Sequence, residues 1–183
     1  MSITKIYLIL LIQIIGCFHV IGQDLKPQLI IPSGNTGRVD QISFSQDSKY
    51  VASSFGSDQI VVWDILLGKI THTFRASGRV TALHFHPKLP WIIASSATGT
   101  IHFWKYSGNA ASEEIQAHQG AVNTMAISHN GKLLISNGND ALIKVWDIEK
   151  REITTTLNKY SEVFGSAVFD FQDDLITLGS TSG

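Results

Sequence analysis

Three residues in the second half of the chain have the side chains that hydrolases use for nucleophilic catalysis. They are His118, Ser136 and Asp140, which follow one another at separations of 18 and 4 residues. In a Ser-His-Asp triad the imidazole takes the proton of the serine hydroxyl, and the carboxylate orients the imidazole. This chemistry requires that the three side chains meet where a substrate can reach them. The elements that position these residues therefore decide between a catalytic and a structural role.

Histidines form a second candidate site. His84 and His86 alternate in a segment that is predicted as a strand, so their side chains share one face, and His102 lies in a neighbouring strand. Three imidazoles are a donor set that Zn²⁺ accepts. No acidic residue joins them at an informative spacing, and the chain has no glycine-rich phosphate loop with its lysine. We therefore expect neither a metal nor a cofactor.

The composition narrows the classes of partner. The 183 residues include 14 Lys and Arg against 15 Asp and Glu, which gives a formal net charge of -1. This balance argues against nucleic-acid binding, because such binding depends on neutralising phosphates. Hydrophobic residues make up 44% of the chain and charged residues 16%, which indicates a folded protein. The single cysteine, Cys17, excludes an intrachain disulfide.

An internal repeat positions the candidate residues. Trp63, Trp104 and Trp146 are 41 and 42 residues apart, and each ends an alternating segment: IVVW, IHFW or IKVW. Each tryptophan also follows an apolar residue by 19 positions: Phe44, Phe85 and Ile127. Turn signals separate three strand candidates in each copy, and a fourth strand follows each tryptophan. Four short strands in about 42 residues predict the blade of a β-propeller.

The sequence here resembles the WD-repeat family, over the range from Pro27 to Gly183. Trp63-Asp64 and Trp146-Asp147 match the family's Trp-Asp end, whereas Trp104-Lys105 departs from it. The resemblance implies an all-β fold, a WD-repeat β-propeller that is incomplete, with three full four-stranded blades and half of a fourth in an open arc. The expected blades together cover 34–183: 34–75, 76–117, 118–158 and a truncated 159–183.

The resemblance also implies a role for the residues that open this section. In the family a His before the first strand, a Ser or Thr in the second, an Asp in the next turn and the Trp form a hydrogen-bonded tetrad. The third copy matches throughout: His118, Ser136, Asp140 and Trp146. The first copy keeps Ser53 and Trp63 but has Asn35 and Ser57 in the His and Asp positions. The second copy keeps only Trp104, with Ala76, Ala94 and Thr98 in the other positions. Because such a tetrad satisfies buried polar groups, we interpret these residues as structural and not catalytic.

The first 22 residues have the pattern of an export signal. Lys5 precedes the apolar run Ile6–Ile15, and Val20-Ile21-Gly22 forms a small-residue exit, so residues 1–22 are predicted to be a signal peptide cleaved before Gln23. Lipidation of Cys17 and retention as an uncleaved anchor are the alternatives. The expected location is outside the cytoplasm of a bacterium: periplasmic, in the cell envelope or secreted.

The segments at both ends of the repeat region are predicted to determine how the propeller ring closes. Residues 23–33 contain a strand, Gln28–Ile31, that in this family completes the last blade. A fourth copy begins near Val163 and has two strand candidates before Gly183. We expect a fragment of a longer gene product, with a ring assembled from two chains as the alternative.

The resulting functional hypothesis is a non-catalytic scaffold that binds other proteins or peptides on one rim. Candidate contacts lie in loops at that rim: Asn35, Arg38, Phe55, Arg79 and Tyr160. Arginine is enriched at interface hot spots, and Arg38 and Arg79 occupy equivalent places. No nucleic acid is expected, and a membrane is expected only through an uncleaved signal or a lipidated Cys17. The alternatives are a longer enzyme, for example with a caspase-like protease domain, and a structural subunit of the cell envelope.

Overall fold

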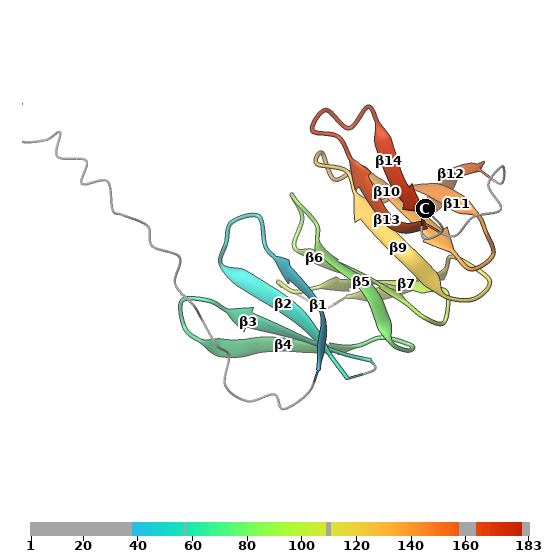
Figure 1. Cartoon of the computed structure of the whole chain (residues 1–183). Coiled ribbons are helices and arrows are strands. Elements are labelled where there is room, and N and C mark those ends of the chain that lie inside the picture. The colour runs from blue at the N-terminus through green and yellow to red at the C-terminus, as the bar shows by residue number, and fades with distance from the viewer. Residues whose placement is uncertain (1–37, 57, 109–110, 158–163, 181–183) are drawn as a thin grey trace, which may run out of the picture. The chain divides into compact units, whose positions relative to one another are not determined.

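The computed structural model describes residues 38–56, 58–108, 111–157 and 164–180, all within one compact unit, Pro32–Gly183. Every helix or strand assigned in these ranges is a β-strand, so the predicted all-β fold is confirmed (Figure 1). No helix in the described part of the chain is long and apolar enough to cross a membrane. Several sequence predictions lie outside the described residues: the signal peptide 1–22, Cys17, the strand 28–31, Asn35, Ser57 and Tyr160.

Four strands form each of the first three sheets, and all neighbouring strands within a sheet are antiparallel. Blade 1 contains β1 (Val39–Phe44), β2 (Tyr50–Phe55), β3 (Gln59–Asp64) and β4 (Lys69–Arg75). Blade 2 contains β5 (Val80–Phe85), β6 (Trp91–Ser96), β7 (Thr100–Lys105) and β8 (Ser112–Gln116). Blade 3 contains β9 (Val122–Ile127), β10 (Leu133–Gly138), β11 (Ile143–Asp147) and β12 (Glu152–Leu157).

The fourth sheet has two described strands, β13 (Phe164–Phe169) and β14 (Ile176–Ser180), which we call blade 4. Phe164 pairs with Ser180 as Val122 pairs with Gly138 in blade 3. The fourth copy is therefore in register with Phe164, one residue later than the predicted Val163. The preceding loop has the same length as the loop before blade 3, not the shorter one before blade 2.

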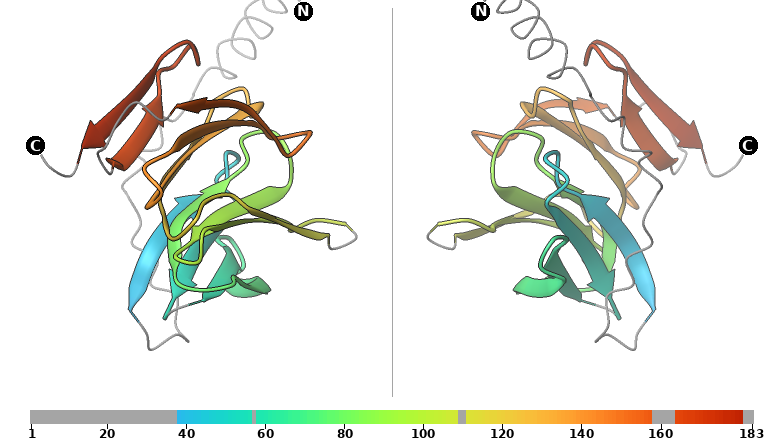
Figure 2. Two further views of the ribbon diagram at one scale, coloured as in Figure 1. Left: turned by 90° about the vertical axis from the view of Figure 1, so that its right-hand side faces the viewer. Right: turned by 90° about the vertical axis from the view of Figure 1, so that its left-hand side faces the viewer.

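The first strands of successive blades contact one another in the order β1, β5, β9, β13. Figure 2 shows the sheets side by side, each turned relative to the one before. Because the right-handed twist of a β-sheet lets one face pack on the next sheet, repeated sheets build an arc around their first strands. This arrangement is the predicted open arc of an incomplete propeller.

The apolar core lies between the blades and not within a single sheet. Three clusters of buried side chains join blade 1 to blade 2, blade 2 to blade 3, and blade 3 to blade 4. Phe85 on β5 and Phe169 on β13 are buried in this way, whereas the equivalent Phe44 on β1 is 64% exposed. Among the described residues no sheet covers that face of β1. Burying a side chain of this size contributes about 1.5–3 kcal/mol.

A close approach between two turns connects blades 2 and 3. Nε2–H of His86 donates to the carbonyl of Gly131 at 2.8 Å, while Nδ1 accepts the N–H groups of Lys88 and Leu89. His86 is therefore neutral, with its proton on Nε2. Gly131 has a φ of 75°, and a Cβ at this position would overlap the His86 ring, so only glycine fits here. In the β10–β11 turn the positive φ falls on Ala141.

Candidate functional site

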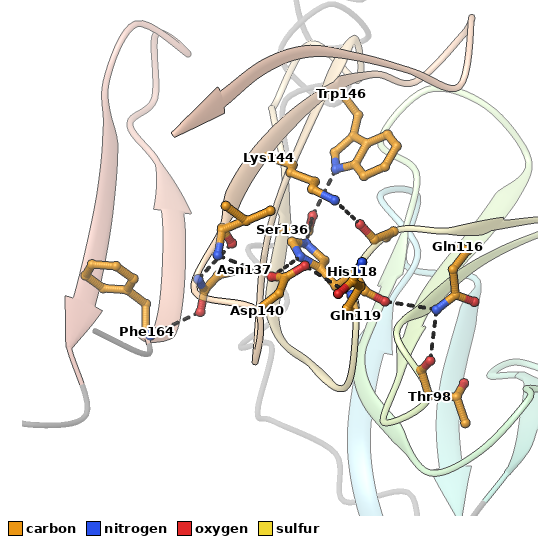
Figure 3. A network of polar contacts seen from close by, with 12 residues as sticks. Thr98, Gln116, His118, Gln119, Ser136, Asn137, Asp140, Lys144, Trp146 and Phe164 are labelled. Atoms are coloured by element: carbon orange, nitrogen blue, oxygen red, sulfur yellow. Dashed lines mark hydrogen bonds and ion pairs between the residues drawn. The ribbon is translucent and has the colours of Figure 1, made fainter. Parts of the chain in front are cut away.

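The four residues of the third copy meet inside blade 3. Asp140 Oδ1 lies 2.8 Å from His118 Nδ1, and His118 Nε2 lies 2.8 Å from Ser136 Oγ. The indole N–H of Trp146 donates to Ser136 Oγ at 2.9 Å. The loop before β9, strand β10, the β10–β11 turn and strand β11 each supply one residue (Figure 3). The network thus ties two strands of the blade, the turn between them and the loop that enters the blade.

The directions of these hydrogen bonds follow from the donors. The indole N–H can only donate, so the Ser136 hydroxyl accepts it and gives its own proton to Nε2 of His118. Nδ1–H of His118 then donates to the Asp140 carboxylate. Burial lowers the pKa of His118, and its bonds to Asp140 partly offset this. Burial raises the pKa of Asp140, but hydrogen bonds from the Gln119 N–H and from His118 outweigh it and hold the pKa below its usual value.

This geometry does not serve a nucleophilic triad. Ser136 is fully buried and His118 is 2% exposed, so no substrate reaches the hydroxyl. The Ser136 oxygen already accepts the indole proton of Trp146, which lowers its capacity to attack a carbonyl. The arrangement instead satisfies the buried polar groups that would otherwise weaken the blade.

Polar contacts extend from the tetrad to both neighbouring blades. The Gln116 side-chain amide on β8 donates to the carbonyls of His118 and Thr98, which connects blade 2 to the loop before β9 (Figure 3). On the other side, the N–H of Phe164 donates to the Asn137 side-chain oxygen at 3.1 Å. Gln116 and Asn137 were not singled out in the sequence, because amides carry no distinctive spacing. The tetrad is thus part of a network across three blades.

Blade 1 has the same strand register but not the same network. Ser53 and Trp63 are both buried, at the places of Ser136 and Trp146. Among the described residues the Trp63 indole N–H has no acceptor. The other two positions of this copy, Asn35 and Ser57, lie outside the described residues.

Blade 2 replaces the tetrad with a different set of side chains. Ser77 takes the place of His118, since Ala76 N donates to Asp58 O as Ala117 N donates to Gly99 O. The prediction that Ala76 is the equivalent was wrong, because the loop before β5 is one residue shorter than the loop before β9.

Ser77 is the centre of this alternative network. Its hydroxyl lies 2.7 Å from Thr98 Oγ1 and 3.0 Å from His102 Nε2, and its N–H also donates to that nitrogen. The other ring nitrogen of His102 lies 3.3 Å from Glu114. Burial lowers the pKa of His102, and the charge of Glu114 partly offsets this. The His102 ring stacks on Trp104 at 5.0 Å, beside Ala94.

The three histidines considered as metal ligands do not converge. Nε2 of His84 lies 3.0 Å from the Met125 carbonyl, while His86 and His102 bond to Gly131 and Ser77 as described. In the described ranges no three His, Cys, Asp or Glu side chains are grouped so that they could hold a metal ion.

The candidate rim contacts lie at the entrance of β5, at the entrance of β1 and at the end of β2. Arg38 and Arg79 each precede the first strand of a blade, are exposed, and accept a backbone N–H from the turn after the second strand. The Arg38 guanidinium is 87% exposed and pairs with Asp40 at 3.0 Å. Phe55 ends β2 and is half-buried beside this turn. In blade 3 the equivalent of the two arginines is Ala121, whose carbonyl accepts the Asn139 N–H.

Comparisons with known proteins agree with this architecture. The family described as "WD domain, G-beta repeat" matches residues 26–64, 68–105 and 111–147. Transducin beta-like protein 3 of Mus musculus is 30% identical over 141 residues, which are 75% of this chain and 18% of that protein. Autophagy-related protein 16 of Arabidopsis thaliana is 24% identical over 156 residues, or 82% of this chain and 31% of that protein. The chain therefore spans less than a third of these relatives.

Solved structures give the same result for the fold. A chain in the crystal structure of the mitotic checkpoint complex is similar with a TM-score of 0.71 at 20% identity, over 80% of this chain and 45% of that one. The computationally designed Ika4 protein is similar with a TM-score of 0.73 at 25% identity, over 87% of this chain and 95% of that one.

Proposed function

Because the chain belongs to the WD-repeat family, we propose that it is a protein-binding scaffold whose partner contacts the rim carrying Arg38 and Arg79. The observation that carries this proposal is the equivalent placement of two exposed guanidinium groups on adjacent blades. Backbone hydrogen bonds hold Arg38 and Arg79 to the turns that follow the second strands of their blades. The backbone that carries the two cations is therefore preorganised, which lowers the entropy that binding costs.

The proposed partner is a protein or peptide with an acidic or amide-rich surface. Arginine offers a fork of donors to carboxylates, and half-buried Phe55 adds apolar area close to Arg38. The near-neutral charge of the chain favours such a local match over a broad electrostatic attraction to nucleic acid.

Crosslinking with mass spectrometry in cells of the source organism tests this rim. We expect the wild-type chain to crosslink a discrete partner through the loops before β1 and β5, and Arg79→Glu to reduce that crosslink about tenfold. Lys69→Glu is the matched control, because Lys69 is an equally exposed cation at the opposite end of blade 1. An equal loss in both variants, or a crosslink pattern that avoids both loops, contradicts the proposal.

We also propose that residues 1–22 direct export, on the evidence of Lys5 and the apolar run that follows. N-terminal sequencing of the exported protein should begin at Gln23. A lipid-modified Cys17 or a retained Met1 would replace this proposal with an anchored form. The alternative in which the blades accompany a separate catalytic domain is distinguished by the nucleotide sequence that follows the Gly183 codon.

A further inference from the structure

We propose a second binding surface, a groove between blades 2 and 3 that accepts a peptide with an apolar side chain next to an acidic one. The groove is a hollow of about 760 Å³ beside Trp91, Phe103 and Ile148. It is lined by the β5–β6 and β9–β10 turns and by the β11–β12 turn. These turns lie at the opposite ends of the strands from Arg79, His118 and Asp140, so the groove is distinct from the proposed rim.

Beside the hollow, two large side chains of the preceding interface are replaced by smaller ones. Between blades 1 and 2, Tyr106 packs edge-on against Tyr50 at 5.5 Å and against Phe85 at 5.2 Å. At the same positions between blades 2 and 3 the chain has Ile148 in place of Tyr106 and Ile127 in place of Phe85, facing Trp91. The loss of two aromatic rings leaves apolar space beside the indole. Such space takes up an apolar side chain of a partner.

Arg151 forms one wall of this space. Its guanidinium lies 3.9 Å from the centre of the Phe103 ring and 5.2 Å from that of Trp91, and its Nε pairs with Glu113 at 3.0 Å. The backbone of Arg151 has a φ of 59°, at the position where blade 1 has Gly68. A left-handed conformation is unfavourable for arginine, and strain of this kind is retained where the side chain has a role.

The terminal NH₂ groups of Arg151 are the donors of this lining that can take an acidic ligand group. Within the described residues, Nε is the one donor of Arg151 that has an acceptor, and the side chain, 19% exposed, lines the hollow, so a bidentate carboxylate there would supply acceptors for its two terminal NH₂ groups. Lys88 and Lys132 stand exposed at the edge. The lining as a whole is balanced in charge, with three cations and three carboxylates, Glu113, Asp147 and Glu149, so the donors of Arg151, and not an excess of positive charge, select the acidic group.

The apolar part of the ligand has a defined place. Leu89 is 51% exposed and lies at the edge of the hollow with Trp91, above a floor that includes the buried Phe103. A leucine or phenylalanine side chain of the partner would cover Leu89 and contact the indole. A glutamate or aspartate next to this residue in the peptide would then bind the terminal NH₂ groups of Arg151.

A defined set of heptapeptides tests the proposal on the whole chain. Each peptide carries one Phe or Leu and one Glu at varied separation, and a matched set has Gln in place of Glu. We expect at least one Glu peptide to bind, and the Gln version to bind about tenfold more weakly. In an NMR spectrum of the indole N–H groups, the Trp91 signal should move while those of Trp63, Trp104 and Trp146 stay in place.

Arg151→Gly is the decisive variant. Glycine accepts the positive φ and is the natural residue at this position in blade 1, so the fold is retained while Glu-peptide affinity falls about tenfold. Leu89→Ser, an exposed substitution, should weaken Phe and Leu peptides without affecting folding. Arg75→Ala is the matched control, because Arg75 pairs with Asp58 in blade 1, outside the groove.

Three outcomes would contradict the proposal that this groove binds a peptide. The first is that no peptide of the set binds. The second is equal binding of the Glu and Gln peptides, and the third is unchanged binding by Arg151→Gly. Arg79→Glu separates this proposal from the rim: it should leave peptide binding intact, and loss of binding in that variant would move the peptide site to the rim.

Discussion

Blades 2 and 3 form the same four-stranded sheet with different polar networks. In blade 3 the indole of Trp146 donates into Ser136, and the loop before the blade contributes His118. In blade 2 the histidine comes from the strand itself, and the loop contributes Ser77. Trp104 still pairs with Ile92 as Trp146 pairs with Leu134. The alternating apolar residues therefore determine the sheet. Each blade connects the loop that precedes it to the sheet through a different set of polar side chains.

In blade 1 the equivalent indole N–H, that of Trp63, has no described acceptor. An unpaired buried donor costs about 1–3 kcal/mol, so blade 1 forms in spite of this group and not because of it. The difference between the blades then predicts that the same substitution has unequal effects in each. The following four predictions run from the largest expected effect to the smallest.

Ser136→Ala should destabilise the protein by about 3 kcal/mol, because it leaves both the Trp146 N–H and the His118 ring buried without this partner. The equivalent Ser53→Ala should cost less than about 1 kcal/mol, since Ser53 does not accept the Trp63 N–H. Urea denaturation followed by fluorescence gives both free energies of unfolding. Equal costs in the two blades would show that the tetrad adds nothing to blade 3.

His118→Ala and Trp146→Phe should not be additive. Both remove members of one hydrogen-bonded chain that passes through Ser136, so a double-mutant cycle should give a coupling of about 1 kcal/mol. Trp104→Phe combined with His118→Ala is the control pair, because the Trp104 ring stacks on His102 and Phe74 and makes no described hydrogen bond to the blade 3 tetrad. A coupling near zero in the first cycle would mean that the two residues act independently.

The histidines predict a loss of stability in mild acid. Burial lowers the pKa of His102 in the folded state below its unfolded value of about 6.5. Above that pH the ring is neutral in both states, and below it the unfolded chain binds the proton first. As the pH decreases below this value, the free energy of unfolding therefore decreases until the pKa of the folded state is reached. The decrease is at most about 1.4 kcal/mol per pH unit for each such group.

Blade 2 allows this acid sensitivity to be assigned. His102→Gln should reduce the slope of unfolding free energy against pH between 6.5 and 5 by up to about 1 kcal/mol per unit. The slopes that His84, His86 and His118 contribute should remain, because burial lowers their pKa values as well. Chemical denaturation at several pH values measures this. An unchanged slope would show that His102 binds its proton equally in both states.

The difference between Trp63→Phe and Trp146→Phe should be the smallest effect, with Trp63→Phe the milder by about 1 kcal/mol, because both remove the same part of the indole but the Trp63 N–H has no described acceptor. Trp146→Phe, which removes a bonded donor from the same place in blade 3, is its matched counterpart. Thermal unfolding of the two variants provides the comparison. A larger loss for Trp63→Phe would indicate an acceptor outside the described residues.

Much of the fold was predictable from spacing alone. The constant interval from Phe44, Phe85 and Ile127 to the tryptophans placed the strands, because strands of one length and short turns leave little freedom between them. The loops between blades vary by one residue, which is why Ala76 was aligned where Ser77 lies. The spacing does not show whether the missing residue of a shorter loop lies before or after the position of His118, because the hydrogen bonds to the neighbouring turn determine this.

Part of the candidate site was beyond sequence reasoning for a different reason. The groove beside Trp91 depends on the volume of Ile148 relative to Tyr106, and the two are equally good strand-end residues. Arg151 does leave a signal, since it stands in the register of Gly68, where a positive φ is needed. Only the structure shows that its side chain turns toward Phe103.

The close approach of His86 and Gly131 also restricts how this protein can change over generations. Any side chain at 131 would overlap the imidazole, so mutations of that codon are eliminated while His86 remains. Ser45 and Ser128 occupy the place of His86 in blades 1 and 3, so serine is compatible with that position. During evolution residue 131 can therefore be substituted only after residue 86 has been replaced by a small residue. Related sequences should show the two substitutions in that order.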